Sequence, residues 1–152
     1  MGTGMTDRRT NLETAVFAHG SPSREGEPPY RFLDLSGEAL GVRVEEIEPG
    51  GTTSHPHYHV SEEEHVVLLS GEASLHLGHE TLPLKAGDHV WFPAGEAVPH
   101  HIENTSDQAI RLLVFGERKR DDVVVYPKAE MMMIKSASGM RMVAYHEEET
   151  NG

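Results

Sequence analysis

Short β-rich runs, separated by turn residues, constrain the fold of this chain more than any other feature. Each run holds four to seven residues with alternating or β-branched character, and the runs recur at a spacing of roughly ten residues. Many short strands at such spacing favour an all-β sandwich or barrel over a parallel α/β sheet. The runs lie at residues 41–47, 65–69, 73–77, 89–92, 109–115 and 123–126.

Turn residues punctuate the chain between these runs, with Gly, Pro, Asn and Asp at nearly every break. No stretch of the central region shows a helical period with a cap at both ends. The segment AEMMMIKSASGMRMV, residues 129–143, is the exception, because it fits either a short helix or a pair of strands. Its methionines are expected to fill gaps in packing or in an interface.

The length of 152 residues predicts a single domain with its own core. The stretch GSPSREGEPP ahead of Tyr30 is rich in turn formers, so residues 1–29 are predicted to form an N-terminal arm. The barrel is expected over residues 30–118, and residues 119–152 are expected to pack as a C-terminal extension on the barrel or on a partner subunit. The first five residues, MGTGM, hold a second possible start and are expected to lie outside the fold.

The charge of the chain argues against two classes of partner. Asp and Glu number 25 against 13 Lys and Arg, a formal net charge of −12, which repels nucleic acid and anionic membranes. The short basic cluster ERKRDD, residues 117–122, is interpreted as a solvated loop. The absence of cysteine excludes disulfides, and the N-terminal segment lacks an apolar run for a signal peptide, so a cytoplasmic protein is expected.

Histidine clustering is the strongest sign of a functional site. Nine of the eleven histidines fall between His55 and His101. His57 and His59 lie two positions apart, so on a strand both imidazoles project from the same face. The run EEEH that follows places a carboxylate at the start of a returning strand. With a further histidine from the pair at 100 and 101, three imidazoles and one carboxylate would suit a divalent metal and leave positions for water or substrate.

The spacing of the residues around this pair resembles the first conserved motif of the cupin superfamily. Gly51 is followed by five residues and His57, one residue and His59, four residues and Glu64, then six residues and Gly71. Fifteen residues then precede a segment similar to the second cupin motif. The resemblance covers about residues 40 to 116.

The second segment begins at Gly87 and continues through Pro93, Gly95 and His100 to Asn104. Five residues separate the first two of these, and three residues separate the last two. Cupins usually have two residues between the second glycine and the histidine, whereas this chain has four, EAVP, so His101 is a rival to its neighbour. The spacing to the asparagine favours His100.

The resemblance implies a double-stranded β-helix, the jelly-roll type of barrel, as in small bacterial single-domain cupins. It further implies one divalent metal ion, Fe, Mn, Ni or Zn, held by His57, His59, Glu64 and His100. His55 could pair with His57 in place of His59, but Pro56 and the fit of the first motif favour the later pair. Glu63 is likewise a second choice to Glu64.

Strand alternation places Glu64, Val66 and Leu68 on one face of a strand. It places His65, Val67 and Leu69 on the other face. On the strand at 89–92, Val90 and Phe92 similarly lie on the face opposite to that of His89 and Trp91. Both faces are partly apolar, as expected when one lines a barrel and the other meets a second layer or a partner, and a homodimer is therefore expected.

The leading functional hypothesis is a metalloenzyme acting on a small molecule, with isomerase, lyase, hydrolase or dioxygenase chemistry. The alternative is a non-catalytic barrel that binds or senses a small molecule, and a third is a metal that only stabilises the fold. No residue is singled out as general base, although Tyr58, His101 and Glu103 lie near the motifs.

Overall fold

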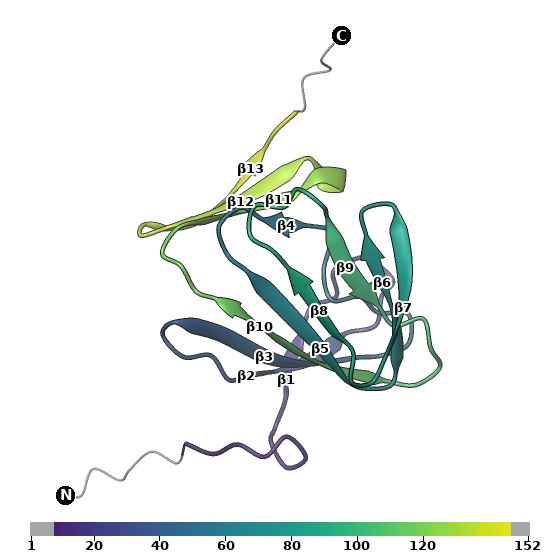
Figure 1. Ribbon diagram of the computed structural model, residues 1–152. Helices are drawn as coiled ribbons and strands as arrows, with labels where there is room; N and C mark the ends of the chain where they lie inside the picture. The colour runs from purple at the N-terminus through teal and green to yellow at the C-terminus, as the bar shows by residue number, and fades with distance from the viewer. Residues whose placement is uncertain (1–7, 147–152) are drawn as a thin grey trace, which may run out of the picture.

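The computed structural model describes residues 8–146, and its regular structure is almost wholly β-strand (Figure 1). Three antiparallel sheets surround one interior, which confirms the predicted all-β barrel of the jelly-roll type. Within the described residues the one helix is a three-residue 3-10 turn, η1 (Pro127–Ala129), and no helix there is long and apolar enough to cross a membrane. The expectation for residues 1–5 falls outside the described residues.

The largest sheet has six strands and forms one wall of the barrel. The predicted runs at 41–47, 65–69, 89–92 and 109–115 all become strands of this sheet, and long connections join them because each jelly-roll strand pairs with one distant in sequence. In spatial order the strands are β1 (Ala18–Gly20), β2 (Tyr30–Asp34), β3 (Leu40–Ile47), β10 (Ile110–Glu117), β5 (Glu64–Ser70) and β8 (His89–Phe92).

Two smaller sheets close the barrel. The first, with the order β7 (Glu80–Lys85), β6 (Glu72–Leu77) and β9 (His100–Glu103), lies at the right in Figure 1. The second lies across the top and has the order β13 (Gly139–Ala144), β12 (Met131–Ser136), β11 (Asp122–Tyr126) and β4 (Tyr58–His59). The last strand, β4, carries one of the predicted metal ligands, so the C-terminal sheet contributes directly to the site.

The structure resolves two local ambiguities of the sequence. Residues 129–143 form the strand pair β12–β13, not a helix, and Met131 to Ser136 pair along their whole length with the following strand. The interpretation of ERKRDD as a solvated loop is wrong at its last residue. Asp122 begins β11 and is only 3% exposed, because that strand turns it toward the barrel.

Alternation on the wall strands divides the barrel interior into an apolar half and a polar half. The inward residues Val66 and Leu68 are buried, whereas Leu69 on the outer face is 38% exposed, as the sequence predicts. On β3 the inward face carries Ile47 in the apolar half and Glu45 in the polar half. The apolar half stabilises the barrel by burial, and the polar half is left for chemistry. The core cluster comprises Ile47, Val66, Leu68, Ala73, Leu75, Leu84, Phe92, Ile102, Ile110 and Leu112.

Gly71, the last residue of the first motif, shows why the motif requires glycine there. Its φ is +86°, a region that disfavours residues with a Cβ. A Cβ at this position would also lie 2.7 Å from Cγ2 of Ile110, a fully buried residue. The glycine therefore lets β5 turn tightly into β6 over the core.

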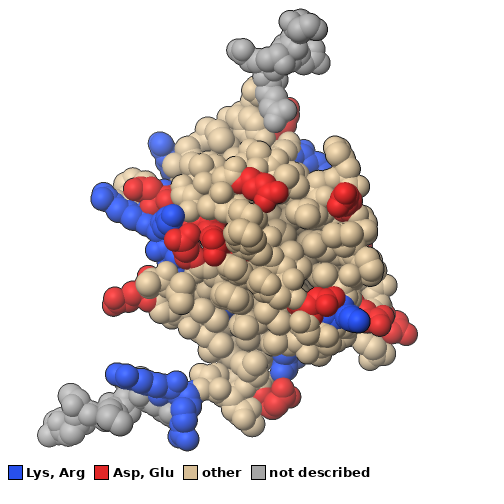
Figure 2. Space-filling view, viewed as in Figure 1, with Lys and Arg blue, Asp and Glu red and all other residues tan. Residues whose placement is uncertain are grey.

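On the face seen in Figure 2 the red acidic groups are scattered, and blue basic groups stand next to several of them. On β13, at the edge of the C-terminal sheet, Met140 and Met142 are 66% and 55% exposed. Apolar side chains on an edge strand are surface that a second chain could cover. The homodimer stays a prediction, which the mass of the protein in solution would test.

Candidate metal centre

Backbone pairing brings the two motifs together. His57 and His100 form an isolated antiparallel bridge, in which each backbone N–H donates to the other's carbonyl, at 3.2 Å and 2.9 Å. The backbone N–H of Gly95 donates to the carbonyl of His59 at 2.9 Å. Residues 43 and 36 positions apart are thus fixed beside each other by main-chain hydrogen bonds, independently of the side chains that face inward.

Three of the four residues predicted as ligands come together in the polar half, and the fourth, His100, adjoins them through Glu64. Ligand atoms of His57, His59 and Glu64 all lie within 4.8 Å of one another. Nε2 of His100 is 3.2 Å from Oε1 of Glu64, and Nε2 of His59 is 3.5 Å from Oε2. We call these four residues the His–Glu cluster. Three imidazoles and one carboxylate at such separations fit a borderline or hard divalent cation, so the donor set is compatible with the metal that the fold implies.

Hydrogen bonds on the outer nitrogens fix the orientation of two of these rings. Nδ1 of His57 lies 2.8 Å from the carbonyl of His55, to which it donates, and Nδ1 of His59 lies 2.7 Å from Oδ2 of Asp122. Each ring consequently keeps its Nε2 for the cluster. Metal-binding histidines usually have such a partner on the second nitrogen, which sets the tautomer and raises the basicity of the ligand.

Asp122 is a functional residue that the sequence reasoning missed. Its second oxygen, Oδ1, accepts a hydrogen bond from the backbone N–H of Ser61 at 2.8 Å, so the carboxylate is held at both ends. The pairing of β11 with β4 brings it beside His59 across 63 positions of sequence. The one local signal was the alternation of DVVVY, which puts Asp122 on the same face as the buried Val124.

The structure separates His100 from its rival. His100 is 4% exposed and stacks on Phe92, with ring centroids 3.5 Å apart, so its edge faces Glu64. The His101 ring instead stacks on His76, with centroids 4.4 Å apart, although the residue also lines part of the space next to the cluster. Consecutive strand residues alternate faces, so only one of the two histidines can reach the cluster.

Glu63 and His55 also lie away from the cluster, whereas Glu62 approaches it from outside, with Oε2 3.9 Å from Nδ1 of His59. Glu63 accepts a hydrogen bond from Nε2 of His65 at 2.7 Å on the outside of the barrel. Glu62 pairs with a lysine of β12, and the side chain of His55 is exposed. His65, which strand alternation directs away from the ligand face, stacks on Phe115 with centroids 5.0 Å apart. The structure therefore brings together the four predicted ligands and none of the residues that rival them in the sequence.

The protonation states of His57 and Glu64 suit a cation, whereas His59 has to lose a proton before it can bind one. Burial, together with repulsion from His100, lowers the pKa of His57 to about 4. Burial also disfavours charge on His59, but hydrogen bonds to Glu64 and Asp122 outweigh it and raise the pKa to about 9. Burial by itself would raise the pKa of Glu64. Hydrogen bonds from His100 and His59 outweigh this effect and hold the pKa below its ordinary value. An ionised carboxylate and a neutral His57 at pH 7 are the forms that bind metal.

A cavity of about 260 Å³, the interior cavity, opens on the cluster from inside the barrel. Glu45 and Arg43 of β3 line it, together with Tyr126 at the end of β11. Glu45 is 7% exposed, and its burial raises the pKa to about 7, although Arg43 at 3.5 Å opposes the shift. The sequence reasoning missed Glu45, although two charged residues on the inward face shared with Ile47 were a visible irregularity in the alternation.

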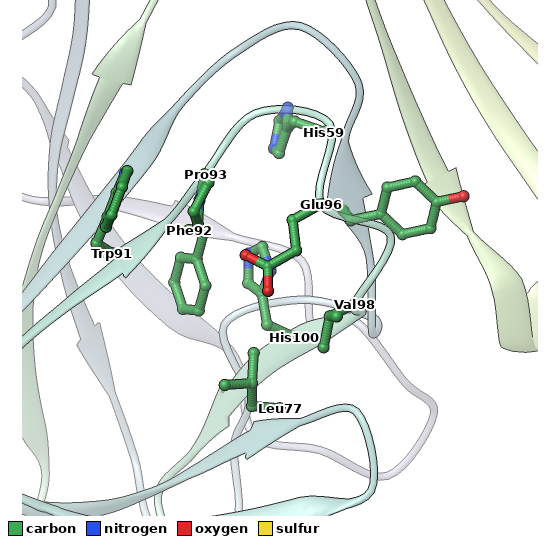
Figure 3. Close-up of a pocket in the computed structure, with 9 residues that line it drawn as sticks. His59, Leu77, Trp91, Phe92, Pro93, Glu96, Val98 and His100 are labelled. Atoms are coloured by element: carbon green, nitrogen blue, oxygen red, sulfur yellow. The ribbon is translucent and has the colours of Figure 1, made fainter.

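A second cavity of about 300 Å³, the loop cavity, lies on the other side of His59 and His100 (Figure 3). The four-residue stretch EAVP, which is longer than the cupin pattern, supplies Glu96 and Val98 to its wall. Figure 3 shows the Glu96 carboxylate directed into this cavity, in front of the His100 ring. The longer stretch therefore shapes an approach to the cluster.

We predict that Asp122→Asn weakens metal binding by roughly 10- to 100-fold while the strands stay folded. The amide keeps the shape of the carboxylate but removes the negative charge that raises the basicity of His59. Competition with a chelator measures the affinity. The control is Asp121→Asn, the same change at an exposed neighbour. Equal affinities in the two variants would remove Asp122 from the site.

Comparison with known proteins supports this description of the fold. The cupin domain family matches residues 43–116, which include every residue of the cluster. A putative sugar phosphate isomerase from Acidithiobacillus ferrooxidans is 26% identical with a TM-score of 0.81, covering 90% of this chain and 91% of that one. A cupin-superfamily sugar phosphate isomerase from Silicibacter pomeroyi is 24% identical with a TM-score of 0.76, covering 95% and 99%.

An uncharacterised protein of Aquifex aeolicus is 34% identical over 65 residues. The match covers 43% of this chain and spans about half, 52%, of the length of that relative.

Proposed function

Since the chain belongs to the cupin superfamily, whose barrel hosts many activities, we propose a function from the site itself. The protein is a metal-dependent isomerase that moves a proton between neighbouring carbons of a small hydroxy-carbonyl compound, of the aldose–ketose type. The observation that carries this proposal is Glu45, a buried carboxyl group that faces the same cavity as the His–Glu cluster.

Glu45 has the properties of a general base. Such a base works best when its pKa lies near the operating pH, and burial raises the pKa of Glu45 to about 7. Arg43 beside it, at 3.5 Å, stabilises the ionised form and keeps the pKa from rising further. An ordinary surface glutamate would be too weak a base for the same task.

His57, His59, Glu64 and His100 would hold the divalent ion, whether Fe, Mn, Ni or Zn. When bound, such an ion supplies a Lewis acid that polarises a carbonyl or hydroxyl oxygen of the substrate. Phe92 packs flat on His100 and limits the movement of that ring. The cluster is therefore supported by its own surroundings on at least two sides, by Asp122 and by Phe92.

The residues of the chain account for the proton transfers. Glu45 takes the proton from the carbon next to the carbonyl group and returns it to the former carbonyl carbon. The hydroxyl proton of the substrate moves to the former carbonyl oxygen, so the reaction balances without a further reagent. Burial and the nearby Glu64 raise the pKa of Tyr126, which therefore stays protonated and can donate a hydrogen bond to a substrate oxygen.

The similarity over nine tenths of the chain to a putative sugar phosphate isomerase supports this class of reaction over the other chemistries that the cluster could serve. Lyase, hydrolase and dioxygenase reactions do not need a base beside the cluster that takes up and returns the same proton. A barrel that only binds its ligand needs no such base at all.

The test uses protein purified without a histidine tag, loaded in turn with each of the four metals. Small aldose and ketose phosphates are incubated with it in deuterated water, and NMR follows the C–H next to the carbonyl. We expect the isomer to appear, with deuterium at the former carbonyl carbon wherever the proton held by Glu45 exchanges with the solvent before it is returned. Absence of both with every metal and substrate would overturn the isomerase, and tight binding without exchange would identify a binding protein.

A further inference from the structure

A third cavity, of about 310 Å³, lies against the interior cavity and is lined by Arg24, His55, His101, Tyr126 and Lys128 among others. We propose that this cationic cavity is an oxyanion subsite, which binds the phosphate group of the substrate. Its place in catalysis rests on the proposed function, but its affinity for phosphate does not. Neither the sequence motifs nor the matching family segment includes Arg24 or Lys128.

The charge of the cavity contrasts with that of the chain. The protein carries a formal net charge of −12, yet among the described residues that line this cavity none is acidic. The positive charges come from Arg24 and Lys128, which meet in one concave surface with two histidines; burial lowers the pKa of His101 to about 4, so that ring is neutral at pH 7. Clefts lined by one sign of charge concentrate ligands of the opposite sign.

Arg24, whose side chain is 45% exposed, is held in place by an ion pair with a largely buried glutamate. Its Nε lies 3.0 Å from Oε1 of Glu27, whose side chain is 11% exposed, and Glu27 accepts a hydrogen bond from Oγ1 of Thr52 at 3.1 Å. The ion pair engages Nε, and the terminal amino groups keep the remaining donors of the guanidinium. A guanidinium restrained in this way is suited to bidentate contact with a phosphate.

His101 supplies an observation that points independently to a ligand. Its Nδ1 is buried and has no hydrogen-bond partner among the described residues. The ring is stacked on His76, with centroids 4.4 Å apart and planes within 10°, which restricts its rotation toward another partner. A buried polar nitrogen without a partner is costly, and a ligand oxygen in the cavity would satisfy it.

The position of the cavity connects it to the reacting site. His101 and Tyr126 line both this cavity and the interior cavity that holds Glu45. An anionic group bound at Arg24 and Lys128 would therefore leave the rest of a small molecule directed toward the His–Glu cluster. The volumes of about 260 and 310 Å³ together lie in the range of small-ligand sites.

This assignment gives a role in binding to the segments that precede and follow the predicted barrel. Arg24 belongs to the segment predicted as an N-terminal arm, and Lys128 lies in η1, directly after β11. Both segments meet the barrel at the loop around Pro56, between the first motif's glycine and its histidines. Residues outside the conserved barrel can thus set which substrate the metal site receives.

The binding test uses metal-free protein and inorganic phosphate, with calorimetry or NMR as the readout. Arg24→Gln combined with Lys128→Gln is expected to weaken phosphate binding by at least ~10-fold, because two charge-assisted contacts are lost. The matched control is Lys85→Gln with Arg120→Gln, which removes the same charges from exposed positions. An equal loss in both double variants, or phosphate binding unchanged in the first, would overturn the subsite.

A second measurement separates this proposal from the isomerase. Metal content by elemental analysis should be the same in both double variants and in the unmodified protein. With a sugar phosphate substrate, KM should rise at least ~10-fold in the subsite variant with little change in kcat, whereas an unphosphorylated sugar should show no such rise. If the subsite variant turned over the sugar phosphate with an unchanged KM, the subsite would be overturned and the isomerase would stand. Phosphate binding without any turnover would uphold the subsite and overturn the isomerase.

Discussion

Protein in which His57 and His59 are both replaced by alanine is expected to retain no metal through purification, whereas the unmodified protein retains about one equivalent. Both side chains present Nε2 toward Glu64, since hydrogen bonds to His55 and Asp122 occupy their Nδ1 atoms. Their loss leaves two donors of the four, too few to hold a divalent ion against dilution. Elemental analysis measures the metal, and far-UV circular dichroism checks that the strands remain.

The control for this experiment is His19→Ala with His79→Ala, because both of these histidines are exposed and lie outside the cluster. It removes the same number of imidazoles and should leave the metal content unchanged. Glu64→Gln adds a variant of nearly identical shape, in which only the charge is lost, and it should also lose metal. Unchanged stoichiometry in the His57 and His59 variant, with normal strand content, would contradict the assignment of the site.

The strands of the barrel and three residues of the cluster could be predicted because they depend on short-range order in the sequence, whereas His100, 36 positions beyond Glu64, was assigned from the spacing of the second motif. The strand at His89–Phe92 has the bounds that its alternation predicts, and β3 differs by one residue. The pair His57 and His59 and the carboxylate at Glu64 lie within eight positions of each other, so motif spacing alone is informative. Where strands lack alternation, as in β7 with its Pro83, the sequence predicts none, although an edge strand tolerates proline.

The groups around the cluster could not be predicted because distant pairing places them. Asp122 reaches His59 only through the register of β11 against β4. Glu45 lies on β3, which pairs with β10. On its other edge β10 pairs with β5, the strand that carries Glu64. No spacing in the sequence encodes these contacts, since each depends on which strands adjoin in the folded barrel.

Arg24 illustrates the same limit outside the barrel. The Gly- and Pro-rich stretch around it predicts a loop, which says nothing of what that loop contacts. Its ion pair with Glu27, and the contact of Glu27 with Thr52 of the first motif, anchor the loop beside the site. The division into an arm at residues 1–29, a barrel at 30–118 and an extension at 119–152 remains a prediction, although β11 of the last segment pairs with β4 of the barrel.

Glu45→Gln is expected to reduce kcat for isomerisation by roughly 10²- to 10⁴-fold, the usual contribution of a general base. The amide has nearly the size of the carboxyl group but cannot accept the substrate proton. Glu45 lies outside the His–Glu cluster, so the metal content should be unchanged, and KM should change little. The control is Glu48→Gln, the same substitution at an exposed position of the neighbouring turn. Activity in Glu45→Gln within a few-fold of that in the control would exclude Glu45 as the base.

The pH dependence of the unmodified enzyme tests the same residue from another direction. A base must be ionised to act, so kcat/KM should rise with pH as Glu45 loses its proton. Burial raises the pKa of Glu45 to about 7, and the positive charge of a bound metal nearby moves it downward, so the inflection should lie at or below about pH 7. The residual activity of Glu45→Gln should lack this rise. If the variant kept the same rise, a different group would be taking the proton, and Glu45 would serve only to position Arg43.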